Sequence, residues 1–168
     1  MIPIVGIVGS RSNVGKTFVM ENIIKELKNR NYKVATIKHD VHGFDMDQPG
    51  KDTWKHAEAG ADTVIISSAK KMAMIKKVEV ELTIEEIVEK VTDVDIILVE
   101  GYKKSNLPKI EVFNSDICKE LYCDKKNLIA VASDVDIKID GVAVCNKEDA
   151  ISLVDIIEQK IIRIAKNK

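Results

Sequence analysis

The sequence predicts an α/β fold, in which a mostly parallel β-sheet carries helices on both faces. Short runs rich in Val and Ile recur along the chain, and helical patterns separate several of them. These runs cover residues 2–8, 32–38, 62–67, 95–100, 127–133 and 141–145. Strands that are buried on both faces by flanking helices read as near-continuous apolar runs. The alternation of such runs with helical patterns therefore favours a parallel sheet.

Three helices are predicted from apolar spacing and end signals. The first covers residues 16–30. Its apolar face is formed, at helical spacing, by Phe18, Ile23, Ile24 and Leu27. The second covers residues 83–91, where Thr83 precedes Glu86 by the three residues of a capping box. The third covers residues 146–168 and has a basic end that suits the helix dipole.

One segment departs from the alternation of strands and helices. Residues 61–81 contain two apolar runs around a short polar turn, which is the pattern of an antiparallel β-hairpin. We expect this hairpin to extend from the parallel sheet. Its exposed backbone edges make pairing with a second copy of the chain plausible.

Length and composition limit the kinds of protein that this chain can be. We expect residues 1–168 to form one domain. The formal net charge of −1 gives no reason to expect nucleic acid as a partner. Three cysteines without a CxxC pair fit a reducing compartment, and no apolar run is long enough for a membrane span. We therefore expect a cytoplasmic protein without a membrane partner.

A glycine-spaced segment after the first run has the pattern of a P-loop, in which backbone amides cradle phosphates, a lysine reaches the terminal phosphates and a hydroxyl binds Mg²⁺. Gly15, Lys16 and Thr17 match the second half of GxxxxGK[ST]. Ser10 holds the place of the first glycine and Gly9 comes one position earlier, so the loop is either a serine variant or one residue longer. The alternative is an ordinary strand-to-helix turn. The predicted phosphate-binding residues are Gly9, Ser10, Arg11, Ser12, Asn13, Val14, Gly15, Lys16 and Thr17.

An acid ends the buried run at residues 95–100. Glu100 is followed at once by Gly101, and ligands of open α/β sheets bind at the carboxyl ends of the strands. We expect Glu100 to face the Mg²⁺ held by Thr17, directly or through water. The alternative is a strand that simply ends in a polar residue.

Residues 38–56 are crowded with groups that suit phosphate or metal chemistry. They contain Lys38, the three histidines His39, His42 and His56, and the four aspartates Asp40, Asp45, Asp47 and Asp52. One aspartate is suited to completing the Mg²⁺ shell, and the histidines are suited to a phosphate, a water or a softer metal. Lys16, Lys38 and Mg²⁺ are expected to stabilise the charge that develops during phosphoryl transfer. The predicted catalytic residues are Lys16, Lys38 and Glu100. The alternative is a solvated polar loop.

Five segments together resemble the family of molybdopterin-guanine dinucleotide biosynthesis protein B. They are "GSRSNVGKT", "IKHDVHGFDMDQPGKDTWKHAEAGA", "VIISSAKKMAMI", "ILVEGYKKSNLPKIEVF" and "IAVASD". The resemblance implies a P-loop protein that binds GTP with Mg²⁺, hydrolyses it weakly and is commonly a homodimer. It also implies an adapter role for the molybdenum cofactor guanylyltransferase, with molybdopterin as a further ligand to consider. By the family's layout, Thr17 and Glu100 share Mg²⁺ with either Asp47 or Asp52.

The identity of the base is the open point. Asn146, Lys147 and Asp149 match the guanine motif NKxD, whose aspartate accepts from two guanine N–H groups that adenine lacks. Asn146 or Asp149 is equally suited to capping the last helix. An alternative function is an ATP-dependent kinase or ligase acting on a small metabolite, and a third is a phosphate-binding module without catalysis.

Overall fold

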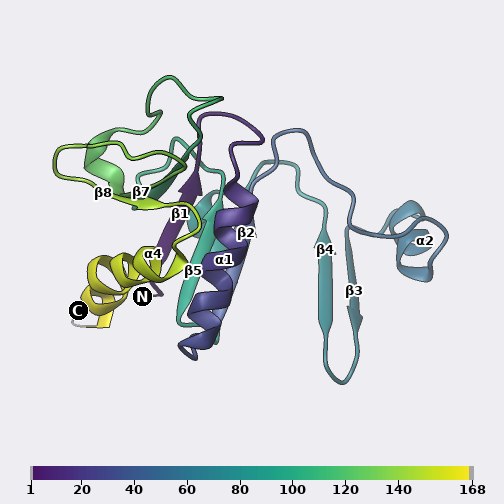
Figure 1. Ribbon diagram of the computed structural model, residues 1–168. Coiled ribbons are helices and arrows are strands. Elements are labelled where there is room, and N and C mark those ends of the chain that lie inside the picture. The colour runs from purple at the N-terminus through teal and green to yellow at the C-terminus, as the bar shows by residue number, and fades with distance from the viewer. Residues whose placement is uncertain (1, 167–168) are drawn as a thin grey trace. The chain divides into compact units, whose positions relative to one another are not determined.

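The computed structural model describes residues 2–166 and groups the chain into two compact units (Figure 1). The first unit combines the two ends of the chain, up to His39 and from Val91 onward, and the second spans Asp40–Lys90. The expectation of one domain over residues 1–168 stays a prediction. Each unit has its own secondary structure.

The first unit is built on a six-stranded sheet within the described residues. The strand order is β2-β5-β1-β6-β7-β8, and every pairing is parallel. The strands are β1 (Ile4–Val8), β2 (Val34–Lys38), β5 (Ile96–Glu100), β6 (Lys109–Phe113), β7 (Leu128–Ser133) and β8 (Ala143–Asn146). The α/β class is confirmed. Strand β6 is an addition, because no predicted strand covers Lys109–Phe113.

The register of the central strands brings three carboxyl ends together. Glu100, the last residue of β5, pairs with Ile7 of β1 on one side and with Lys38 of β2 on the other. The loop that follows β1 therefore leaves the sheet beside Glu100 and Lys38. This is the edge at which open α/β sheets bind ligands.

Two helices of the first unit pack against each other and against the sheet. They are α1 (Lys16–Asn29) and α4 (Ala150–Ile157), and α4 continues into a π-helical turn, η2 (Glu158–Ile162), and a last α-helical turn, α5 (Arg163–Lys166). A short 3-10 turn, η1 (Lys125–Asn127), precedes β7. The core between helices and sheet is apolar and fully buried. It includes Val5, Ile7, Ile23, Leu27, Leu98, Ile110, Leu153 and Ile157.

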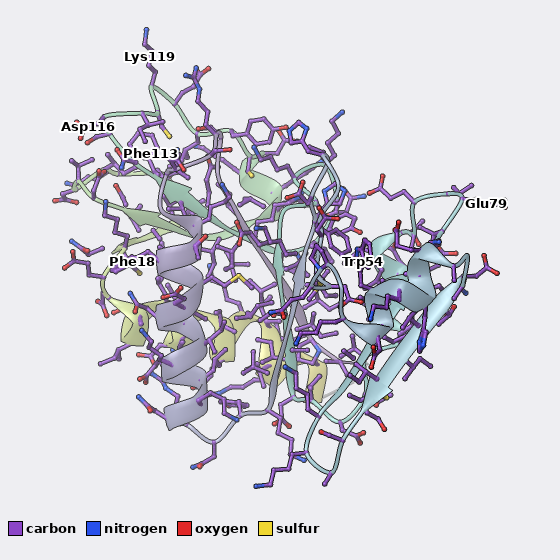
Figure 2. All side chains as sticks on the ribbon, turned by 90° about the vertical axis from the view of Figure 1, so that its right-hand side faces the viewer. Phe18, Trp54, Glu79, Phe113, Asp116 and Lys119 are labelled. Atoms are coloured by element: carbon purple, nitrogen blue, oxygen red, sulfur yellow. The ribbon has the colours of Figure 1, made fainter. Side chains whose placement is uncertain are left out.

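The buried face of α1 differs from the prediction at one residue. The helix buries Val19, Ile23 and Leu27, which recur at intervals of four and so form one stripe along the helix. Met20, which is also buried, widens the stripe on one side, whereas Phe18, labelled in Figure 2, lies on the other side of Val19 and is 46% exposed. The prediction that Phe18 belongs to the core face is wrong, whereas Ile23 and Leu27 are confirmed.

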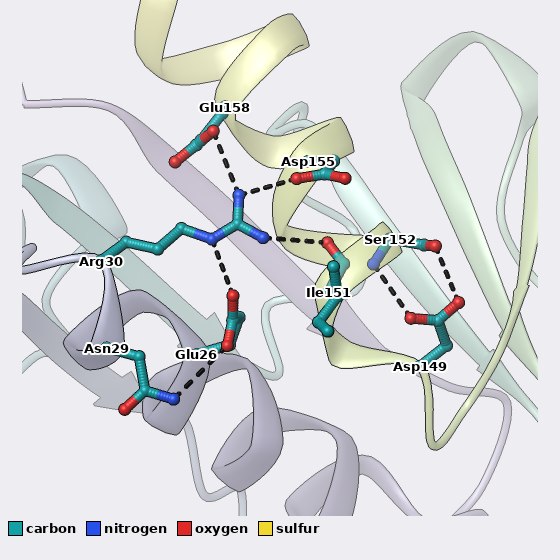
Figure 3. Close-up of polar contacts among 8 residues, drawn as sticks. All are labelled: Glu26, Asn29, Arg30, Asp149, Ile151, Ser152, Asp155 and Glu158. Carbon is teal, nitrogen blue, oxygen red and sulfur yellow. Dashed lines mark hydrogen bonds and ion pairs between the residues drawn. The ribbon is translucent and has the colours of Figure 1, made fainter.

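Arg30, at the C-terminal end of α1, links this helix to α4 (Figure 3). Its guanidinium donates to Glu26 at 2.8 Å and to Asp155 at 2.7 Å, and it lies 3.2 Å from Glu158. Hydrogen bonds to Asp155 and Glu26 raise the pKa of Arg30. The positive charge near the end of α1 also suits the helix dipole.

The second unit contains a hairpin and two short helices. Its elements are α2 (Asp52–Glu58), β3 (Thr63–Ser67), β4 (Met72–Lys76) and α3 (Ile84–Val88). Strands β3 and β4 pair antiparallel as a separate two-stranded sheet, which confirms the predicted hairpin. The capping box is also confirmed, since the Glu86 backbone donates to Thr83 and the Thr83 backbone donates to the Glu86 carboxylate. No helix in the described part of the chain is long and apolar enough to cross a membrane.

Candidate functional site

The loop between β1 and α1 needs glycine at two of its positions, Gly9 and Gly15. Gly15 has φ of 102° and stands at the N-cap of α1, where a glycine offers no capping side chain. A Cβ on Gly9 would lie 2.6 Å from the side chain of Val14 and 3.2 Å from the carbonyl oxygen of Val112. The close approach therefore requires glycine at position 9, which favours a loop that is one residue longer than GxxxxGK[ST].

Ser10, at the place of the missing glycine, has a structural partner. Its hydroxyl lies 3.1 Å from the sulfur of Cys118, a buried residue in the segment between β6 and β7. This contact holds one side of the loop against the body of the first unit. The sequence carries no motif around Cys118, so this contact was not predicted.

Lys16 lies at the centre of a charged group at the sheet edge. Its ammonium donates to the backbone carbonyl of Arg11 at 2.9 Å, across the loop. Burial lowers the pKa of Lys16, the carboxylate of Glu100 acts in the opposite direction, and the ammonium groups of Lys103 and Lys38 lower it further. The structure thus brings together Lys16, Lys38 and Glu100, all three of which were predicted as catalytic residues.

The carboxyl ends of β2 and β5 are held together closely. The backbone N–H of His39 donates to the carbonyl of Glu100 at 2.9 Å. Gly101 has φ of 100°, and a Cβ there would lie 2.9 Å from the Cβ of His39. The His39 ring stacks on Tyr102 with centroids 4.4 Å apart. His39 therefore has a structural role here, since it packs against the residues that end and follow β5.

Lys103 also contacts the phosphate loop, although this contact was not predicted from the sequence. Its ammonium donates to the carbonyl of Ser10 at 3.0 Å and lies 5.3 Å from the ring centroid of Tyr122. A lysine three residues after a strand is common on surfaces, and no pattern in the sequence signals a bond to a distant backbone carbonyl. Lys103 adds a third ammonium group to those of Lys16 and Lys38.

Residues of the predicted histidine and aspartate loop beyond His39 belong to the second unit. Asp47 accepts from the backbone of Gln48 at 2.8 Å and from the hydroxyl of Thr53 at 3.1 Å. Asp52 is the first residue of α2 and lies 3.6 Å from Lys55, with its side chain 91% exposed. The described residues contain no group of three or more His, Cys, Asp or Glu side chains suited to holding a metal ion.

The NKxD match caps a helix. Asp149 is the N-cap of α4, and its carboxylate accepts from the backbone of Ser152 at 3.0 Å and from the Ser152 hydroxyl at 2.7 Å. Asn146 accepts from the backbone of Glu148 at 2.9 Å, and Lys147 lies 3.7 Å from Asp134. The capping role that the sequence allowed for Asp149 is therefore confirmed.

A comparison with known protein families identifies the family of this chain. Residues 4–134 match the family described as molybdopterin guanine dinucleotide synthesis protein B, MobB. This chain belongs to the MobB family. The matched region contains the loop Gly9–Thr17, Lys38 and Glu100, and it ends before Asn146.

Two relatives carry the name molybdopterin-guanine dinucleotide biosynthesis adapter protein. The Haemophilus influenzae protein is 33% identical over 141 residues, which cover 83% of this chain and 79% of that protein. The Escherichia coli protein is 34% identical over 164 residues, which cover 94% of this chain and 92% of that protein.

Solved structures of MobB proteins share the fold. Bacillus subtilis MobB matches with a TM-score of 0.76 at 24% identity, covering 94% of this chain and 98% of that one. A MobB homologue from Bacillus stearothermophilus matches with a TM-score of 0.67 at 17% identity, covering 96% of this chain and 98% of that one. The fold of this chain is therefore that of the MobB proteins.

Proposed function

We propose that this chain is an adapter protein of molybdopterin-guanine dinucleotide biosynthesis that binds GTP with Mg²⁺ and hydrolyses it slowly. The adapter role is supported by the MobB family membership and by the names of the two relatives. Nucleotide binding is supported above all by the loop at the centre of the sheet edge, where Lys16 lies beside Glu100 and two further lysines.

The loop is suited to a phosphate chain. The first N–H groups of α1 lack intrahelical partners and point out of the helix N-terminus, where they favour an anion. Lys16 would exchange its bond to the Arg11 carbonyl for a bond to a terminal phosphate oxygen. Lys38 and Lys103 add positive charge to the same edge. Because Arg11 is the sole arginine of residues 9–17 and its side chain is exposed, we expect slow hydrolysis.

The side chains at this edge also fit Mg²⁺. Thr17 supplies a hydroxyl and Glu100 a carboxylate, and hard oxygen donors are the ligands that Mg²⁺ prefers. When bound, Mg²⁺ supplies charge neutralisation for the phosphates. That Asp47 or Asp52 completes the shell stays a prediction from the family resemblance.

The nucleotide proposal is tested by calorimetric titration with GTP and with ATP, each with and without Mg²⁺. We expect a Mg²⁺-dependent preference for GTP that is lost in Lys16→Ala and retained in Lys25→Ala, which removes an exposed lysine of α1 away from the loop. A preference for ATP would overturn the guanine assignment and favour the metabolite kinase or ligase. Binding that is indifferent to Mg²⁺, Thr17 and Glu100 would favour a phosphate-binding module without catalysis.

The adapter role is tested with a molybdenum cofactor guanylyltransferase, the partner we propose. Addition of this chain is expected to increase the rate at which that enzyme forms the dinucleotide from molybdopterin, and Lys16→Ala is expected to lose the effect. An unchanged rate with the wild-type chain would contradict the adapter role. We also propose that the protein acts in the cytoplasm. Its three cysteines are free thiols, and free thiols are typical of proteins in a reducing compartment.

We also propose a homodimer that forms through the hairpin. One face of this two-stranded sheet exposes Ile65, Met72 and Met74, each by more than half of its surface, and such an apolar surface favours association. Ile65→Glu is expected to give monomers in sedimentation experiments. The control Val135→Glu, which also places a carboxylate on an exposed apolar side chain but in the first unit, is expected to leave the dimer intact. A monomeric wild-type protein would overturn this proposal.

A further inference from the structure

A second polar pocket lies in the first unit beside the phosphate loop. It has a volume of about 200 Å³ and is lined by the segment after β5, the first residue of β6 and the segment that leads to β7. This volume is below the 300–1,000 Å³ that is typical of sites for drug-sized ligands. The pocket therefore suits a small group or one end of a larger molecule.

The lining of this pocket is strongly basic. Four of the lining residues are lysines, namely Lys103, Lys104, Lys109 and Lys126, whereas Asp124 is the single acid among them. Burial raises the pKa of the Cys123 thiol, another lining group, to about 12, with a further contribution from the nearby Glu111. The thiol is therefore neutral at physiological pH and does not offset the lysines. Such a concave surface of one charge sign concentrates anions.

A buried lysine is among the residues that line the pocket. Lys109 is 2% exposed, although a lysine is almost never buried without a partner. Its ammonium donates to the backbone carbonyl of Ser105, which leaves further N–H groups of the ammonium for other acceptors. Within the described residues, the buried hydroxyl of Ser105 has no hydrogen-bond partner. A buried hydroxyl without a partner is destabilising, and an acceptor in the pocket that Ser105 lines would supply one.

A second buried charge holds in place the part of the lining that carries Tyr122 and Cys123. Glu111 is 1% exposed and follows Lys109 on the same face of β6. Its carboxylate accepts from the backbone N–H groups of Tyr122 and Cys123 at 2.7 and 2.9 Å. The wall that carries Tyr122 is thereby fixed to the strand that carries Lys109. The pocket is consequently a built feature of the fold, and its shape does not depend on exposed side chains alone.

The pocket and the phosphate loop share one side chain. Lys103 lines the pocket, lies over the Tyr122 ring and donates to the carbonyl of Ser10 in the loop. We propose that this pocket is a second anion site, which binds the phosphate group of a small molecule, free or as a monoester, and that Lys103 couples its occupancy to the nucleotide loop. The proposed coupling rests on the proposed nucleotide binding, whereas the proposed anion site is independent of it.

The site is tested by amide NMR titration of the Lys16→Ala protein, whose nucleotide loop is disabled, with inorganic phosphate and with phenyl phosphate at constant ionic strength. We expect saturable shifts of the Ser105, Tyr122 and Cys123 amides with at least one of these probes, and the tighter-binding probe tells free phosphate from a monoester. The affinity is expected to fall about tenfold or more in Lys104→Gln/Lys126→Gln, because each charge-assisted bond is worth about 1.5–3 kcal/mol.

The matched control is Lys119→Gln/Lys125→Gln, which removes two exposed lysines that do not line the pocket. Lys119 projects away from the molecule in Figure 2. An equal loss in the control, or no saturable shift at Tyr122, would overturn the site. Shifts that occur only with Lys16 intact would assign the anion to the nucleotide loop and also overturn it.

The coupling has a separate test. The affinity of the wild-type protein for GTP with Mg²⁺ is measured with and without saturating phenyl phosphate, and we expect it to change severalfold. The change is expected to disappear in Lys103→Gln. No change in the wild-type protein would overturn the coupling alone, and an absence of GTP binding would contradict the proposed function while leaving the pocket to its own test.

Discussion

At the scale of single residues, close approaches of the backbone decide where glycine is needed around the site. Gly9 begins the loop and faces Val14 and Val112, whereas Gly6, three residues earlier in β1, has more room. A Cβ on Gly6 would meet its nearest neighbour, the side chain of Lys109, at 3.4 Å, an ordinary contact. These two glycines therefore differ in what an added methyl group would do.

We predict that Gly9→Ala lowers the free energy of unfolding by about 1–3 kcal/mol, because overpacking forces neighbouring atoms to move. It is also expected to weaken nucleotide binding, since the displaced Val14 is a loop residue. Gly6→Ala is the control and is expected to stay within about 0.5–1 kcal/mol of the wild type. Urea unfolding of both variants checks this prediction, and equal stability of the two would contradict it.

At the scale of elements, the ends of the helices separate structural roles from binding roles. Asp149 accepts two hydrogen bonds from Ser152 at the start of α4, although the NKxD pattern also suggested a contact with guanine. The hydrogen bond from the Ser152 backbone, together with that from its hydroxyl, lowers the pKa of Asp149. The folded chain therefore stabilises the ionised carboxylate of Asp149 relative to the unfolded chain.

We predict that Asp149→Ala lowers the free energy of unfolding by about 1 kcal/mol near neutral pH, which is typical of a lost N-cap. A lowered folded pKa adds stability that is present above the unfolded pKa and is lost as the pH falls through the folded pKa, below 3.8. The difference between variant and wild type is therefore expected to shrink in acid. Unfolding measurements across this pH range check it, and an accompanying large loss of GTP affinity would instead favour the guanine motif.

The ion pairs of Arg30 connect α1 with the segment formed by α4 and η2, and together they should stabilise the folded chain. We predict that Arg30→Ala lowers the free energy of unfolding by about 1–2 kcal/mol, since partly buried charged hydrogen bonds are stronger than exposed ones. A double-mutant cycle with Asp155→Ala measures the pair. A coupling energy near zero would mean that the 2.7 Å contact in Figure 3 contributes nothing to stability.

The elements differ in how well the sequence predicted them, and the reasons are physical. Strands such as β5 and β7 are apolar up to their last residues, Glu100 and Ser133, so their burial was visible in the sequence. Strand β6 was missed because Lys109 and Glu111, both buried, interrupt its apolar pattern. Their partners are backbone groups of Ser105, Tyr122 and Cys123, which any residue type could supply.

At the scale of the whole molecule, the division into two units was not visible in the sequence. No Gly-rich, Pro-rich or Ser-rich linker marks the boundaries near residues 39 and 90. The site was predictable where a motif defines it, at Gly15, Lys16, Thr17 and Glu100. It was not predictable where Lys103 and Cys118 contact the loop, because those contacts depend on the path of the chain between β5 and β7.

The two units should also differ in local stability. Among the described residues of the second unit, Val64 and Ile84 are the buried apolar side chains, whereas β1, β5, β6 and β7 of the first unit are buried along their length. Segments with few buried apolar contacts open at low free energy cost. We therefore predict that amides of β3 and β4 exchange with solvent faster than those of β5 in hydrogen-exchange mass spectrometry.

Protein concentration makes this measurement also a test of the hairpin surface. If a second copy covers Ile65 and Met74, the protection of β3 and β4 should rise with concentration in the wild type and not in Ile65→Glu. Protection of β5 should stay constant, because its side chains are already buried within the first unit. Hairpin amides as slow as those of β5 at every concentration would contradict the predicted difference, since the hairpin would then be stabilised within a single chain.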